Sequence, residues 1–227
     1  MVVSLTFLLV FTTPLSASER TFAEAELLEL TRLASELSVT VDEIMNFETN
    51  LRAAFDISNE KVYFAQRDNF DTLSDIEVQV SENLFLTVTN TIEYGEADFF
   101  VVCDSRPSSA WIDFTVTSTA TIRSVVGITL VEMRTFHRFF QMHGLPASPV
   151  DARGALSTGL GYGTSTHSSL TGMSGNTAFA RTTFNIVYAI GISPINMIIQ
   201  TSQINAITNV PQFHGPGGVH SIWTSWQ

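Results

Sequence analysis

The chain has 227 residues, enough for one or two domains, and 44% of them are hydrophobic, which excludes a generally disordered chain. It carries 22 acidic against 11 basic residues, giving a formal net charge of −11, and it has no run of Lys or Arg. Nucleic acid and an anionic membrane surface are therefore not expected as partners, because both are bound through clustered basic side chains. The one cysteine, Cys103, allows no internal disulfide, and its apolar neighbours indicate a buried small residue.

Residues 2–11 form an apolar run, VVSLTFLLVF, close to the start of the chain. Its length suits the hydrophobic region of a signal peptide and is too short to span a bilayer, which takes about 20 residues. Ser16 and Ser18 are small enough for a cleavage site, so we expect a signal peptide over residues 1–18 and a secreted, extracytoplasmic protein. The alternative is a first β-strand, because Val, Thr and Phe also favour strands.

Two capping-box patterns, a Thr followed three residues later by a Glu, predict helix starts at Thr21 and Thr40. Apolar residues then recur at helical spacing in two stripes: Leu27, Leu30, Leu33, Ala34 and Leu37, and then Ile44, Phe47, Leu51 and Phe55. The sequence predicts two helices, over about residues 22–37 and 41–55, that fold into an antiparallel hairpin.

The pattern changes after residue 77, where apolar and polar residues alternate as they do in half-buried strands. Between residues 121 and 142 helical spacing returns, and Gly144 and Pro146 follow in the order expected after a helix end. We expect an α+β fold. It combines the N-terminal helical hairpin, a further helix near 121–142, and β-rich segments at 77–118 and 178–200.

The stretch from Gly154 to Gly175 is rich in Gly, Ser and Thr, which is typical of a connection between domains. We therefore divide the chain into a signal peptide (1–18), a helical hairpin with a mixed region (19–150), a Gly/Ser/Thr-rich connection (151–177) and an apolar, β-prone C-terminal segment (178–227).

The histidines do not form a recognisable metal site. His137 and His143 are six residues apart, which places them on opposite faces of a helix, and the zinc motif H-E-x-x-H is absent. His214 and His220 flank a glycine-rich turn and could meet on a metal, but an exposed tail is the simpler expectation. We expect no metal and no cofactor.

Other candidate groups are equally weak. The residue types of a catalytic triad are present in Ser174, His167 and Asp151, but the glycines around Ser174 lack the spacing of a G-x-S-x-G turn. The alternating glycines of residues 159–163 (GLGYG) lack the strand, helix and Lys of a phosphate-binding loop, so we expect a flexible linker there. Trp223, Trp226 and Phe213 would form either a small apolar patch for a partner or a contact with the parent fold. We predict no catalytic residue.

One stretch resembles a known family. It consists of residues 46–51 (NFETNL) and, about 20 residues later, residues 69–76 (NFDTLSDI). These two segments resemble the F-E-x-x-L-A and N-x-x-T-L-x-E-L segments in the N-terminal helical region of neprilysin-like zinc metallopeptidases. The resemblance covers residues 30–76 and extends faintly to 140, with Arg52 where the family has Ala. It implies a mainly α fold and a truncated or degenerate lobe, because the family's zinc-binding and catalytic residues have no counterpart in this chain.

Together these observations favour a secreted, non-catalytic protein that binds a peptide or another protein. The alternative, from a different class, is an exported structural or adhesive assembly protein built on a β-rich domain. Helices over residues 77–120 would favour the first, and paired strands would favour the second.

Overall fold

A computed structural model of the chain describes residues 24–60, 74–95, 111–142, 145–158, 166–192, 195–212 and 222–227. Its helices are α1 (Glu24–Leu37), α2 (Val41–Met45) and α3 (Phe47–Glu60). Its strands are β1 (Ser74–Ser81), β2 (Leu84–Tyr94), β3 (Trp111–Ser124), β4 (Thr129–Met142), β5 (Ser148–Thr158), β6 (Thr166–Ser174), β7 (Thr177–Ile192), β8 (Ile195–Pro211) and β9 (Trp223–Trp226).

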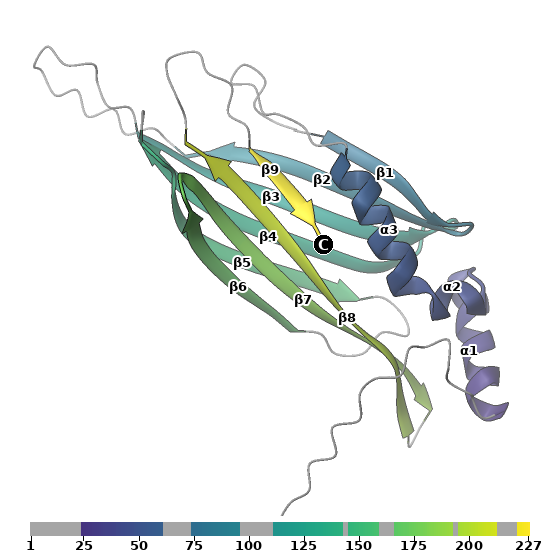
Figure 1. Cartoon of the computed structure of the whole chain (residues 1–227). Helices are drawn as coiled ribbons and strands as arrows, with labels where there is room; N and C mark the ends of the chain where they lie inside the picture. The colour runs from purple at the N-terminus through teal and green to yellow at the C-terminus, as the bar shows by residue number, and fades with distance from the viewer. Residues whose placement is uncertain are drawn as a thin grey trace, which may run out of the picture.

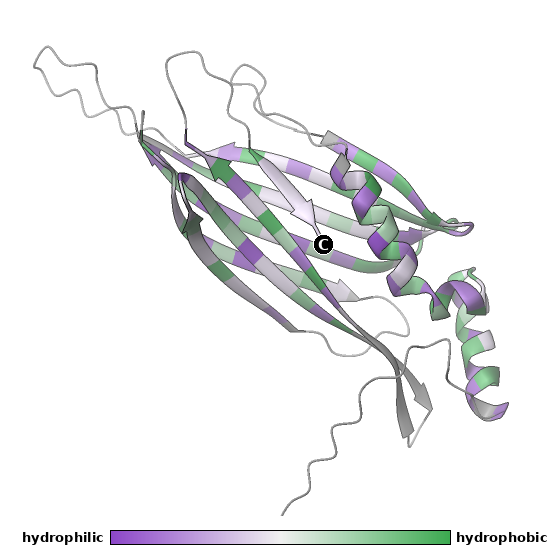
Figure 2. Ribbon diagram, in the orientation of Figure 1, coloured by the Kyte–Doolittle hydropathy of each residue, from purple (hydrophilic) through white to green (hydrophobic). Residues whose placement is uncertain are grey.

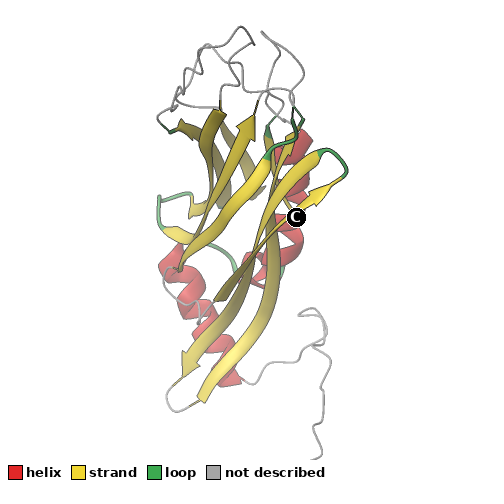
Figure 3. Cartoon of the chain, turned by 90° about the vertical axis from the view of Figure 1, so that its left-hand side faces the viewer, coloured by secondary structure: helices red, strands yellow, loops and turns green. Residues whose placement is uncertain are grey.

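The strands form two antiparallel sheets in which each strand pairs with the next one along the chain. The first sheet has the order β1-β2-β3-β4-β5 and the second the order β6-β7-β8-β9. The sheets face each other, and β5 lies beside β6 and β7 at one side of the molecule. At the other side α3 packs against β1, β2 and β9, so the helix fills the gap between the two outermost strands (Figures 1 and 3).

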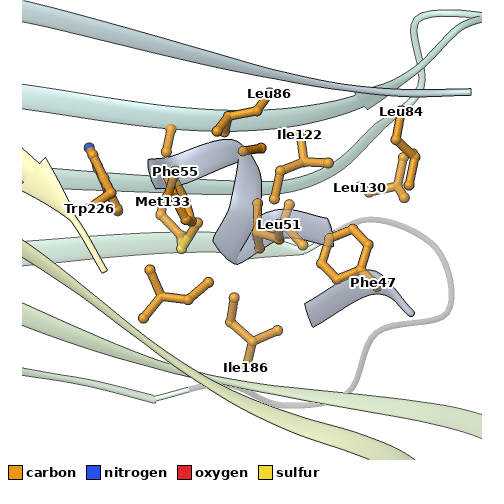
Figure 4. Close-up of a cluster of buried hydrophobic side chains, with 14 of the residues drawn as sticks. Phe47, Leu51, Phe55, Leu84, Leu86, Ile122, Leu130, Met133, Ile186 and Trp226 are labelled. Carbon is orange, nitrogen blue, oxygen red and sulfur yellow. The ribbon is translucent and has the colours of Figure 1, made fainter. Parts of the chain in front are cut away.

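The apolar stripe of α3 points into the space between the sheets. Figure 4 shows Phe47, Leu51 and Phe55 directed at side chains of both sheets. All three are 1–2% exposed. Phe55 stacks on Trp226 of the second sheet, with ring centroids 5.7 Å apart. One amphipathic helix therefore joins the two sheets into a common hydrophobic core.

The strands follow from alternation of side chains between the two faces of each sheet. Along β2 every second residue from Leu84 to Val88 is buried and the residues between them are partly exposed. Figure 2 shows the same alternation of hydrophobic and hydrophilic residues on the strands of both sheets.

The helix predicted near 121–142 is wrong. The segment holds the end of β3, a turn, and the whole of β4, and the β3–β4 pairing runs from Trp111 opposite Met142 to Arg123 opposite Thr129. The inward positions of β4 include Thr135 and His137 between Met133 and Phe139. These two buried polar residues interrupt the apolar alternation, so the sequence pattern matched a helical period instead.

The α+β fold class and the antiparallel helical hairpin are also wrong, as is the mainly α alternative. The described residues are predominantly β, and their three helices are short. The predicted second helix is split at Asn46 into α2 and α3, and α3 packs on the sheets, whereas α1 lies near α2 and β7. Strands do occupy the segments expected to be β-rich, but they belong to two complete sheets that dominate the fold.

Local features of the helical region agree with the sequence. The capping box at Thr40 is confirmed, with the Glu43 amide donating to Thr40 Oγ1 at 3.1 Å and the Thr40 amide donating to Glu43 Oε2 at 2.7 Å. The first stripe is buried from Leu30 to Leu37, but Leu27 is half exposed. The capping box at Thr21 and the expected signal peptide lie outside the described residues.

The segment expected to be a connection, residues 151–177, contributes to both sheets. Residues 151–158 lie in β5 and residues 166–174 form β6, while residues 159–165 lie outside the described part of the chain. Gly154 shows why a small residue is needed there, because a Cβ at this position would approach Thr182 Cγ2 to 2.6 Å. Glycine in β5 permits close contact between the two sheets.

Candidate functional site

A belt of polar side chains crosses the interior between two hydrophobic clusters. Its members are Ser118, Thr135 and His137 from the first sheet and Thr182 and Thr208 from the second, and all five are fully buried. The inward residues next to this polar belt on the same strands are apolar. Burying a polar group costs free energy unless the group is hydrogen-bonded. The hydrogen-bond partners therefore determine whether the belt stabilises the packing of the two sheets.

His137 is hydrogen-bonded across the space between the sheets. Its Nδ1 lies 2.7 Å from Thr208 Oγ1, its Nε2 lies 3.0 Å from Thr182 Oγ1, and Thr208 is linked in turn to Thr224 at 2.8 Å. Burial lowers the pKa of His137 to about 4, so the ring is neutral near pH 7 and has one donor and one acceptor nitrogen. The arrangement satisfies both nitrogens and braces one sheet against the other.

A second buried polar group, Glu43, fastens the helices to the first sheet. Its carboxylate accepts hydrogen bonds from Ser81 Oγ at 2.6 Å, from the Asn83 amide at 2.8 Å and from Asn83 Nδ2 at 3.1 Å, besides those from Thr40. Burial alone would raise the pKa of Glu43, but the hydrogen bonds from Ser81, Thr40 and Asn83 outweigh it and lower the pKa to about 2. We call this group the Glu43 clasp.

Strands β7 and β8 extend beyond the strands that flank them, as Figures 1 and 3 show. Strand β6 pairs with β7 only as far as Asn185, opposite Thr166, and β9 pairs with β8 only between Ala206 and Asn209. The remaining pairing, from Ile186 opposite Ser202 to Ile192 opposite Ile195, forms a two-stranded ribbon. No strand in the described part of the chain pairs with either outer side of this ribbon.

The two sides of the ribbon differ. On the β8 side the nearest contacts lie just before the ribbon, where Arg52 Nη2 donates to the Gln203 carbonyl at 3.1 Å and Gln227 exchanges two backbone hydrogen bonds with Asn205. Within the ribbon the pairing shifts beside Ile199, a β-bulge that makes the β8 strand irregular. Such bulges and side-chain contacts are known ways of protecting a strand edge from further pairing.

The outermost strands of the two sheets are covered by α3. Asn59 Nδ2 donates to the Trp226 carbonyl at 2.6 Å, and the Trp226 amide donates to Asn59 Oδ1 at 3.0 Å, so the helix satisfies the outer edge of β9. The same helix packs against β1.

The β7 side of the ribbon has no such protection among the described residues. Strand β7 is paired continuously with β8, with the extra residue of the bulge on β8. Helix α1 approaches β7, and in the described part of the chain it adds no backbone hydrogen bond to the strand. We refer to the backbone groups of Ile186–Ile192 that face away from β8 as the β7 edge.

The ribbon lies in an uncharged part of the chain. All Asp, Glu, Lys and Arg residues lie at or before Arg181, so residues 182–227, which number 227 − 181 = 46, contain none. The net charge of −11 therefore belongs to the rest of the molecule. An edge strand without charged residues is unusual, because charges commonly prevent one sheet from pairing with another.

The structure does not bring the residues of the suggested triad together. His167 and Ser174 both lie in β6, seven residues and therefore about 23 Å apart along an extended strand. Asp151 lies in β5 and forms an ion pair with Arg153 at 2.5 Å.

Several other residues that the sequence suggested as functional lie outside the described residues. They are His143, His214, His220, Cys103 and residues 159–163. Within the described residues no three His, Cys, Asp or Glu side chains are grouped to hold a metal ion.

Of the C-terminal aromatic residues, Trp226 is docked on the parent fold. It is fully buried, stacks on Phe184 with centroids 5.9 Å apart, and donates from Nε1 to Ser118 Oγ at 3.0 Å. Trp223 is partly exposed in β9, and Phe213 lies outside the described residues.

The sequence indicated an apolar β-prone segment at 178–200 but not its unpaired edge. The signal that could have suggested it is the absence of charge after Arg181, combined with a run of β-branched residues.

Comparison of the chain with protein-family models, with curated proteins and with solved structures gave no match. Among the described residues, no helix combines the length and the hydrophobicity needed to cross a membrane.

Proposed function

We propose that this protein is an exported, non-catalytic assembly protein that binds an extended polypeptide segment by strand addition at the β7 edge. In strand addition the backbone hydrogen bonds of a sheet edge supply affinity, and side chains on alternate positions supply selectivity. The observation that carries the proposal is the uncharged ribbon, whose β7 edge is regular and unpaired within the described chain.

The absence of charge defines the partner. A ribbon without Asp, Glu, Lys or Arg offers no ion pair to a charged segment, and burying an unpaired charge beside it would be costly. The β7 edge therefore favours an extended, uncharged, β-prone segment of about seven residues, the length of Ile186–Ile192.

In this proposed function the buried polar groups have a structural role. Both ring nitrogens of His137 are bonded to threonines between the sheets, and the Glu43 carboxylate is occupied by the clasp. These contacts stiffen the two sheets and the helices, which supports a rigid platform for the ribbon.

Export and the family resemblance remain predictions. The expected signal peptide over residues 1–18 would place the protein outside the cytoplasm, where an assembly protein could act. The resemblance to neprilysin-like peptidases was expected to bring helices over 77–120. Because β1, β2 and β3 run through the described parts of that region, we base the proposal on the β-rich alternative.

A synthetic peptide with the sequence of residues 186–192 (IVYAIGI), flanked by uncharged Ser and Asn residues and carrying a fluorophore, tests strand addition directly. We expect it to raise the fluorescence anisotropy on titration with the protein. It should also slow amide hydrogen exchange within residues 186–192 of the protein. The slower exchange would locate the contact at the β7 edge.

The matched control is the same peptide with alternate backbone amides N-methylated, which keeps its side chains and removes hydrogen-bond donors. We expect at least a tenfold weaker affinity, about 1.4 kcal/mol, for this control. Equal affinity of the two peptides, or binding that leaves the exchange of residues 186–192 unchanged, would contradict strand addition.

A further inference from the structure

We infer that the partner at the β7 edge is a second copy of this chain, with the two β7 edges paired antiparallel about a two-fold axis at Ala189. This inference rests on the proposed strand addition and names its partner. The arrangement places residue 186 of one copy opposite residue 192 of the other, and residue 187 opposite residue 191. It joins the two second sheets into one continuous sheet.

The length of the β7 edge fits this arrangement. The edge begins beyond Asn185, the last β7 residue paired with β6, and ends at Ile192, the last residue of the strand. That leaves seven positions, Ile186–Ile192, and an antiparallel copy of the same segment fills them. In the symmetric pair the tip of each ribbon reaches the start of β6 in the other copy. A two-fold axis requires such a self-complementary surface.

The charge distribution also favours a second copy. Two molecules with a net charge of −11 repel each other over most of their surfaces, whereas residues 182–227 carry no charge. The ribbon is therefore the part through which two copies can approach with least repulsion. The chain itself also supplies the partner that the β7 edge requires, an uncharged segment rich in β-branched residues.

Within the described residues, the β7 edge presents unpaired backbone groups as well as an apolar sequence. A second strand satisfies these groups in a way that a lipid surface cannot, because acyl chains offer no hydrogen-bond partners. Binding of the ribbon to lipid would therefore leave its backbone groups unsatisfied, and it is one of the outcomes that the experiments below distinguish.

The mass of the full chain in solution, measured by size-exclusion chromatography with light scattering over a range of concentrations, tests the inference. We expect wild type to show twice the chain mass at high concentration and to dissociate on dilution. Ala189→Lys places two ammonium groups opposite each other at the two-fold axis, and we expect dimerisation to weaken at least tenfold. Ala189→Ser, a neutral substitution at the same position, should still dimerise.

Charge complementation makes the test specific. We expect Ala189→Lys and Ala189→Glu to be monomeric alone and to form a dimer when mixed, because opposite charges then face each other. Circular dichroism and the thermal unfolding midpoint of each variant check that it is folded. A wild-type chain that is monomeric at its highest soluble concentration would overturn the inference. So would a dimer that Ala189→Lys leaves unchanged.

Cysteine cross-linking tests the register in a Cys103→Ser background. Oxidation should link two Ala189→Cys chains covalently, because directly opposed strand positions are within disulfide distance. Val187→Cys should not self-link, because its counterpart in the other copy lies four positions away, about 13 Å along the strand. Efficient linkage at both positions, or at neither, would contradict pairing about Ala189.

The outcomes separate this inference from the proposed function. If the IVYAIGI peptide binds and protects residues 186–192 but the chain never dimerises, strand addition stands and the second copy is excluded as partner. If neither peptide binding nor dimerisation occurs, both fail. If the ribbon instead binds uncharged phosphatidylcholine vesicles while the chain stays monomeric, the lipid surface replaces the second copy.

Discussion

Replacing His137 by Gln tests whether the polar belt braces the sheets through a neutral imidazole. Gln can donate and accept a hydrogen bond but does not titrate, so it removes the proton equilibrium while retaining polar contacts with Thr182 and Thr208. At pH 7 we expect a loss of about 1–2 kcal/mol in the free energy of unfolding, since the geometry of the two hydrogen bonds is altered.

The larger effect is on the pH dependence. Burial lowers the pKa of His137 from 6.5 to about 4 in the folded protein, so the unfolded chain takes up a proton first as the pH falls. The contribution of neutral His137 to stability is complete above about pH 6.5 and is lost progressively between pH 6.5 and 4. Between pH 7 and 4.5 this loss amounts to about 2–3 kcal/mol.

The assay is urea-induced unfolding of both proteins, followed by circular dichroism at pH 7 and at pH 4.5. Groups that titrate in both proteins contribute equally, so the difference between the two pH-dependent losses isolates His137. We expect wild type to lose about 2 kcal/mol more than His137→Gln. Losses that agree to within about 0.5 kcal/mol would refute the description of His137 as a buried neutral brace.

Three further substitutions test other contacts. Glu43→Gln should reduce the free energy of unfolding at pH 7 by about 2–3 kcal/mol after allowance for solvent screening. Wild type should lose this advantage as the pH falls from about 4.5 to 2, because the pKa of Glu43 is lowered in the folded state. Acid unfolding of both proteins checks this. Gly154→Ala should cost about 1–3 kcal/mol in urea unfolding, because the new methyl group meets Thr182; an unchanged midpoint would contradict the close approach of the sheets. Trp226→Phe retains aromatic stacking but leaves Ser118 without its indole donor, and should lower stability by about 1–2 kcal/mol in the same assay; a loss near zero would show that the hydrogen bond contributes little.

The helical region could be predicted because its signals are local. The capping box at Thr40 and the stripe from Ile44 to Phe55 depend only on neighbours within four residues, and both are present in the structure. The partner of the stripe is not local. A helix with one apolar face can pack on another helix or between two sheets, and the sequence pattern is the same in both cases.

The polar belt made the strands of the first sheet harder to recognise in the amino-acid sequence. A half-buried strand is recognised by apolar residues at every second position, but Ser118 in β3 and Thr135 and His137 in β4 occupy inward positions. Their burial is acceptable only because partners from the opposite sheet or a neighbouring strand satisfy them, for example Thr182 for His137. Those partners are distant in sequence, so no local pattern could reveal them.

The β7 edge could not be predicted for a related reason. Composition alone marks the region after Arg181 as uncharged and β-prone. Whether an edge is free depends on where the neighbouring strands end, and in the described part of the chain β6 pairs with β7 only as far as Asn185. Strand register is set by turns and by packing across the whole sheet, and it is not contained in the segment itself.

Amide hydrogen exchange of β7 tests the central claim most directly. In monomeric Ala189→Lys we expect the outward-facing amides of residues 186–192 to exchange much faster than those of residues 177–185, which are paired on both sides by β6 and β8. In concentrated wild type these outward-facing amides should become protected, because a second β7 edge covers them. If residues 186–192 are already as protected as residues 177–185 in the dilute monomeric variant, the chain covers its own edge. That result would contradict the account.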